Sequence, residues 1–122
     1  MILVVDDDQQ VRATIVRGLT ALGYAVREAA GGADALALIG EQKPQLIVLD
    51  YMMPGMDGAE TAREIARIDP DLPIIFSTGH AALRVLRQAA GEGVSILEKP
   101  FTLAELDQLI SETLQARRVR SA

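Results

Sequence analysis

The chain has 122 residues, of which 49% are apolar, and it carries a formal net charge of −5. One domain with an ordinary core is expected at this length, and the acidic balance argues against direct nucleic-acid binding, which usually needs a basic excess. The absence of cysteine excludes disulfides and thiolate metal sites. No apolar run reaches the roughly 20 residues that span a bilayer, and no signal segment opens the chain, so a cytoplasmic domain without membrane contact is expected.

Five short apolar runs predict β-strands, at residues 1–5, 24–29, 46–49, 72–77 and 94–97. The run at 46–49 is apolar on both faces, which is typical of the centre of a parallel sheet. The segment 24–29 alternates between apolar and polar residues, as a half-buried edge strand does.

Helices are predicted in the segments after the strands. Asp8 is expected to cap the first helix, whose apolar stripe is Val11, Ile15, Leu19 and Leu22. Further helices are predicted at 33–42, 59–68 and 82–90. Asp57 followed by Glu60 forms a capping-box-like start for the third of the five. The last helix begins with the capping box Thr102–Glu105 and has the stripe Leu103, Leu106, Ile110 and Leu114.

The strict alternation of strands and helices predicts an α/β fold. Connections of this kind are right-handed crossovers, which give a parallel sheet with helices on both faces. The periodicity alone leaves the order of the strands open.

Chemically active side chains follow several of these strands. In a parallel sheet the carboxyl ends of the strands meet at one edge, where binding sites usually lie. That edge is expected to carry the following side chains: Asp6, Asp7, Asp8, Asp50, Thr78 and Lys99. Clustered carboxylates suit a hard cation, and Mg²⁺ (or Mn²⁺) fits best because it prefers a few carboxylates together with phosphate oxygens. A lysine and a hydroxyl can bind a phosphoryl group, and an aspartate can accept one as an acyl phosphate.

Four motifs carry a resemblance to a known family. They are Val5-Asp6-Asp7, Leu49-Asp50-x-x-Met53-Pro54-Gly55-Met56-Asp57-Gly58, Ser77-Thr78-Gly79 and Lys99-Pro100-Phe101. With these motifs in this order, the chain from Met1 to about Leu114 resembles the receiver domain of two-component response regulators. The resemblance implies a flavodoxin-like (CheY-like) fold with five parallel strands in the order 2-1-3-4-5 and five helices.

The resemblance also implies a role for each matching residue. Asp50 corresponds to the phosphoacceptor, and the metal ligands correspond to Asp7, Asp50 and the backbone carbonyl of Met52, with Asp6 assisting through water or a hydrogen bond. Thr78 corresponds to the switch hydroxyl and Lys99 to the ammonium that pairs with the phosphoryl group. The bond between Lys99 and Pro100 corresponds to a cis peptide.

Two features depart from, or refine, the family pattern. Ile96 occupies the position where the family often has an aromatic switch residue, so the output is expected to pass through movements of loops and helices. The stretches 77–80 and 97–101 resemble receivers attached to hybrid histidine kinases. A receiver domain is therefore expected over 1–116 and a basic C-terminal tail over 117–122, either as a stand-alone regulator or as a module of a larger protein.

The expected function is that of a phosphoacceptor in a His–Asp phosphorelay. The implied partner is a histidine kinase or a histidine phosphotransfer domain, and the chain is expected to be a monomer or a phosphorylation-dependent dimer formed through its last two helices. It is not expected to be an enzyme, although it would assist its own phosphorylation and dephosphorylation. Two alternatives remain open: a phosphohydrolase with an aspartate nucleophile, which usually needs a second acid where this chain has Met52, and a pseudo-receiver that serves as a scaffold.

Overall fold

The structure is a computed structural model that describes residues 1–90 and 95–121. It contains five strands and five helices in strict alternation. The strands are β1 (Ile2–Val5), β2 (Val26–Ala29), β3 (Leu46–Asp50), β4 (Ile74–Thr78) and β5 (Ser95–Glu98). The helices are α1 (Gln9–Ala21), α2 (Gly32–Glu41), α3 (Gly58–Ile68), α4 (His80–Ala90) and α5 (Leu103–Ser121).

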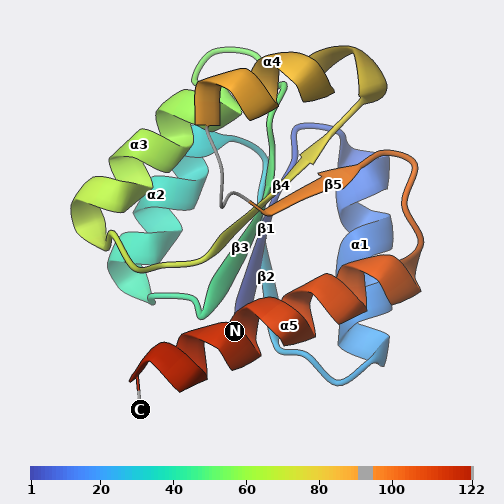
Figure 1. The fold of residues 1–122 in the computed structure, drawn as a ribbon, viewed down its shortest axis with the longest axis vertical. Coiled ribbons are helices and arrows are strands. Elements are labelled where there is room, and N and C mark those ends of the chain that lie inside the picture. Colours follow the sequence, from blue (N-terminus) through green and yellow to red (C-terminus); the bar gives the residue numbers. More distant parts are fainter. Residues whose placement is uncertain (91–94, 122) are drawn as a thin grey trace.

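The strands form one parallel sheet in the order β2-β1-β3-β4-β5. Both the α/β class and the strand order therefore agree with the prediction. In Figure 1 helices α2 and α3 lie on one side of the sheet, and α1 and α5 lie on the other. None of the helices in the described ranges is long and apolar enough to cross a membrane.

Alternate residues of the central strands fill two cores. Leu3 and Val5 of β1 belong to the core beneath α2 and α3, whereas Ile2 and Val4 belong to the core beneath α1 and α5. The second core takes its helical side chains from the predicted stripes: Ile15, Leu19, Leu106 and Ile110. Each such side chain contributes about 1.5–3 kcal/mol when fully buried, so this aliphatic packing fixes the helices on the sheet.

The predicted caps begin three of the helices. The Asp8 carboxylate accepts hydrogen bonds from the amides of Gln10 and Val11 at 3.0 and 3.2 Å. Asp57 accepts from the Glu60 amide at 2.8 Å. At the start of α5, Thr102 and Glu105 exchange two bonds of 3.1 Å, as the capping box predicts.

Several details of the sequence prediction are corrected. Leu22, expected on the inner stripe of α1, is 48% exposed, because α1 ends at Ala21 and Leu22 is its C-cap. Leu103 is 39% exposed, since it is the first residue of α5. The fourth strand begins at Ile74 and not at residue 72. Tyr24 precedes β2, and its hydroxyl donates to Asp107 of α5 at 2.6 Å.

Two expectations are not tested. Residue 94, predicted to open the fifth strand, lies outside the described residues. Helix α5 continues past residue 116 to Ser121, and the division into a domain over 1–116 and a tail over 117–122 stays a prediction.

Candidate functional site

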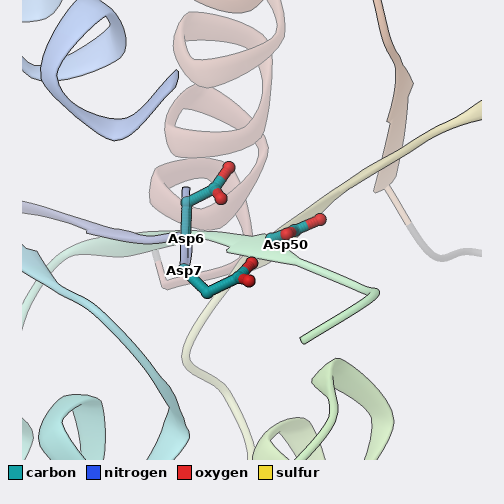
Figure 2. Close-up of side chains that lie close together, drawn as sticks. All are labelled: Asp6, Asp7 and Asp50. Carbon is teal, nitrogen blue, oxygen red and sulfur yellow. The ribbon is translucent and has the colours of Figure 1, made fainter. Parts of the chain in front are cut away.

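Three carboxylates meet at the carboxyl ends of β1 and β3. Asp6 and Asp7 follow β1 directly, and Asp50 is the last residue of β3, the strand paired with β1. One oxygen from each of the three lies within 4.8 Å of the others. Figure 2 shows the three side chains gathered at this edge of the sheet. Asp6 and Asp50 are 2% and 5% exposed, while Asp7 is exposed, so the cluster has a buried base and one side open to solvent.

Lys99, just beyond β5, joins this cluster from the other side. Its ammonium donates to Asp6 Oδ2 and Asp50 Oδ1, both at 3.4 Å. The Lys99 amide donates to the Thr78 carbonyl at 2.7 Å, which extends the ladder between β4 and β5 beyond the last strand residue. The bond between Lys99 and Pro100 is cis, in agreement with the prediction. Residues 93 positions apart in the sequence are thus held together by the strand order.

Burial and the neighbouring charges change the pKa of the Asp50 carboxyl. Burial raises the pKa of the Asp50 carboxyl from 3.8 to about 6, and the Asp6 charge adds to the increase, while Lys99 opposes it. Burial disfavours the charged form of an acid, and a like charge does the same. The Asp50 carboxyl is therefore mostly ionised at neutral pH, but at a cost that a further cation near it would offset.

Arg12 of α1 holds the main chain of the loop that follows β1, and no role was predicted for it from the sequence. Its Nη1 donates to the Asp6 carbonyl at 2.7 Å, and its Nε donates to Glu28 Oε1 of β2 at 2.9 Å. The Asp6 carboxylate also accepts from the Asp8 amide at 2.9 Å. The only sequence signal is an arginine one helical turn after the Asp8 cap, and such a position is too common to identify a site residue.

Gly58, the first residue of α3, is packed against the main chain that follows Asp50. Its amide donates to the Tyr51 carbonyl at 2.9 Å. A Cβ at this position would lie 2.6 Å from Tyr51 Cα and 2.7 Å from the Asp50 carbonyl oxygen. The Tyr51 ring itself meets Phe76 of β4 edge-on, with ring centroids 6.0 Å apart. Only glycine allows this approach, so Gly58 fixes the path of the chain leaving Asp50.

The remaining predicted site residues lie around this edge. Thr78, the last residue of β4, is fully buried, and its hydroxyl donates to the Gly79 carbonyl at 3.4 Å. Met52 is 63% exposed in the loop after β3. Ile96 lies on β5 beside Phe76 of β4 and is half-buried.

The acidic cluster suits a divalent cation. When all are ionised, three carboxylates and one ammonium leave a formal charge of −2. Ligands on opposite sides of Mg²⁺ are roughly 4.2 Å apart, the three oxygens lie within 4.8 Å of one another, and Mg²⁺ prefers carboxylate and carbonyl oxygens. Asp6, Asp7 and Asp50 could therefore hold such an ion.

Comparison with known proteins identifies the family to which the chain belongs. The family model for the response regulator receiver domain matches residues 2–111. The chain belongs to this family. As a receiver domain it is part of two-component signalling, as the four motifs predicted.

Two groups of relatives illustrate the likeness of this receiver domain. It is 44% identical over 107 residues to the response regulator MprA of Mycobacterium sp. (strain KMS). This alignment covers 86% of the chain. Its fold matches the receiver domain of NtrX from Brucella abortus with a TM-score of 0.88 at 31% identity, covering 94% of this chain and 98% of that one. A response regulator receiver protein from Sinorhizobium medicae gives a TM-score of 0.84 at 34% identity.

This receiver domain spans less than half the length of the curated relatives that it matches. The alignment covers 46% of MprA and, for the longer NtrX structure, 28% of that chain. Those relatives are response regulators, so the predicted attachment to a hybrid histidine kinase stays a prediction, as do the cytoplasmic location and the absence of nucleic-acid contact.

Proposed function

We propose that this receiver domain accepts a phosphoryl group on Asp50 from a phosphohistidine, with Mg²⁺ bound by Asp6, Asp7 and Asp50. One observation carries the proposal: three carboxylates and the Lys99 ammonium converge at the end of the central strand β3. Asp50 is the member of this cluster that both ends a strand and contacts Lys99. The ligand role of the Met52 carbonyl is part of the same proposal.

The reaction requires Asp50 as a carboxylate. With a pKa of about 6, roughly nine in ten of these groups are ionised at pH 7 before any metal binds. One Asp50 oxygen attacks the phosphorus, the bond between phosphorus and the imidazole nitrogen breaks, and the nitrogen keeps the electron pair. The product is an acyl phosphate on Asp50 and a free histidine.

Lys99 and Thr78 then hold the new group. The Lys99 side chain is 29% exposed, and its ammonium already lies 3.4 Å from Asp50 and can pair with a phosphoryl oxygen without a large movement. The Thr78 hydroxyl, now on the Gly79 carbonyl, would rotate to donate to another oxygen, and this rotation would move the start of α4. Bound Mg²⁺ would supply positive charge to the developing phosphoryl oxygens. The chain would then act as a signalling domain and not as an enzyme with turnover.

Labelling from a small phosphodonor tests the proposal. Wild type incubated with labelled acetyl phosphate and Mg²⁺ should incorporate one phosphoryl group that alkali releases, as expected of an acyl phosphate, and Asp50→Asn should incorporate none. The matched control is Asp8→Asn, because asparagine caps a helix as well as aspartate does and the Asp8 side chain accepts hydrogen bonds only from the first turn of α1, at Gln10 and Val11. Undiminished labelling of Asp50→Asn would rule out Asp50 as the acceptor.

Further assays separate the alternatives. Rapid turnover of p-nitrophenyl phosphate would favour the phosphohydrolase, although the place of its second acid is taken by the exposed Met52. No binding of Mg²⁺ in a titration would favour the pseudo-receiver. The kinase or phosphotransfer partner, and dimer formation through α4 and α5, are proposals that labelling from a purified phosphohistidine protein and sedimentation before and after phosphorylation would test.

A further inference from the structure

We propose that Arg12 is a positioning residue for the metal site, acting on Asp7 through the Asp6 carbonyl. The inference rests on the proposed function, because it concerns the Mg²⁺ that Asp7 would bind. The side-chain hydrogen bonds of Arg12 go to the Asp6 carbonyl oxygen and to Glu28 Oε1, and not to the carboxylate of Asp7 or Asp50.

The argument begins with the peptide plane between Asp6 and Asp7. The carbonyl of one residue and the amide of the next lie in one rigid plane, so a group that fixes the carbonyl also fixes how the next residue leaves it. Arg12 Nη1 donates to the Asp6 carbonyl at 2.7 Å. A bond this short from a charged donor is among the strong ones. Arg12 therefore sets the direction from which the Asp7 side chain starts.

The rest of Asp6 is already held by other groups. Its amide donates to the Ala29 carbonyl at 3.2 Å, and its two carboxylate oxygens accept from the Asp8 amide and from Lys99. The Asp6 carbonyl is the remaining polar group of this residue. Without a partner for it, the peptide plane that follows β1 could still rotate. Asp7 itself is exposed, so packing does not fix its carboxylate as it fixes those of Asp6 and Asp50.

Glu28 holds Arg12 in place from the neighbouring strand. Glu28 is in register with Val4 of β1, and its Oε1 lies 2.9 Å from Arg12 Nε. The Arg12 side chain is only 13% exposed, whereas that of Glu28 is 48% exposed. One guanidinium thus joins α1, β2 and the loop after β1, and its forked geometry allows both contacts at once, which a lysine cannot reproduce.

The sign of the effect distinguishes positioning from charge. If Arg12 mattered only as a cation near the carboxylates, removing its charge would strengthen the binding of a divalent cation. If Arg12 positions the loop, the same change would weaken binding. A merely structural ion pair would change the stability of the metal-free protein and leave the affinity for Mg²⁺ as it is.

The experiment compares Arg12→Met and Arg12→Lys with wild type. Mg²⁺ and Mn²⁺ affinities are measured by calorimetry at constant ionic strength, and unfolding by urea is measured in EDTA. Arg12→Met, which keeps the apolar stem, should lower the affinity about tenfold, at the lower end of what the loss of a group supporting a ligand costs. Arg12→Lys, which keeps the charge, should show a smaller loss of about threefold, because its single ammonium cannot make both contacts.

Arg27→Met is the charge-matched control. Arg27 precedes Glu28 on β2, but it pairs with Glu41 at 3.7 Å and is 41% exposed. The Mg²⁺ affinity of Arg27→Met should equal that of wild type or exceed it slightly. Unchanged or higher affinity in Arg12→Met, wild-type affinity in Arg12→Lys, or an equal loss in Arg27→Met would each overturn the inference. If wild type itself bound no Mg²⁺, the proposed function would fail before the role of Arg12 was addressed.

Discussion

Replacing Asp50 by asparagine should stabilise the metal-free protein at neutral pH. The Asp50 carboxyl has a pKa of about 6 in the folded state against 3.8 for the unperturbed group, because burial and the Asp6 charge disfavour its ionised form. For an acid with a raised folded-state pKa, the folded protein holds the proton more tightly than the unfolded chain does. Stability is then lost as the pH rises from about 4 to about 6, and the loss is complete above this window.

The magnitude follows from the size of the shift. About two pKa units correspond to about 3 kcal/mol at neutral pH. Asparagine removes the charge and retains the shape, and the opposing attraction to Lys99 is already contained in the pKa of about 6. We therefore expect Asp50→Asn to raise the free energy of unfolding by about 3 kcal/mol at pH 7.5, and by little below pH 4.

Urea unfolding in EDTA at a series of pH values measures this difference. Asp34→Asn is the control, since Asp34 is exposed in the first turn of α2 and its substitution should cost only about 0.3–1 kcal/mol. Added Mg²⁺ should stabilise wild type more than Asp50→Asn, because one ligand is lost in the variant. The reasoning would be refuted if Asp50→Asn were less stable than wild type at neutral pH without metal, or if the difference did not vary with pH.

Three further substitutions test the packing at the site and away from it. Gly58→Ala should lower stability by about 1–3 kcal/mol and weaken Mg²⁺ binding, since its Cβ would lie 2.6 Å from Tyr51 Cα. Gly40→Ala, in α2 where a Cβ meets nothing within 4 Å, should instead be stabilising. The account would be contradicted if the two glycine substitutions had equal effects on Mg²⁺ affinity in calorimetry and on stability in urea unfolding. Tyr24→Phe should cost about 1 kcal/mol in urea unfolding through loss of the bond to Asp107, with no change in Mg²⁺ affinity; an unchanged midpoint would show that this bond contributes nothing.

The parts of the fold that could be predicted from the sequence depend on local patterns. The caps at Asp8, Asp57 and Thr102 are short-range hydrogen bonds, and the buried positions Leu106 and Ile110 follow from the helical period. The strand order came from the family resemblance, because nothing in the alternation of elements distinguishes one order of parallel strands from another.

The failures occur where local patterns stop or distant residues meet. The helical period placed Leu22 inside, but the helix had already ended. Tyr24 has the alternation of a strand residue, whereas its hydroxyl bonds to Asp107, 83 positions away. For the site, parallel strands predict that Asp6, Asp50 and Lys99 share an edge.

The direction of a long side chain on a helix surface is not given by any period. For that reason Arg12 could not be assigned to the Asp6 carbonyl from the sequence. The equal distances from Lys99 to two carboxylates likewise depend on the register of three strands and on the chain path after β5.

The edge-on packing of Tyr51 against Phe76 has a practical consequence. The chain has no tryptophan and two tyrosines, so its tyrosine emission comes from Tyr24 and Tyr51 and is not masked by tryptophan. Tyr51 is covalently next to Asp50, and its amide is bonded to the Ser77 carbonyl at 3.0 Å, which holds it beside β4. In a Tyr24→Phe variant, Tyr51 is the one tyrosine that remains. Its fluorescence would report on changes of charge at the neighbouring Asp50 without any added label.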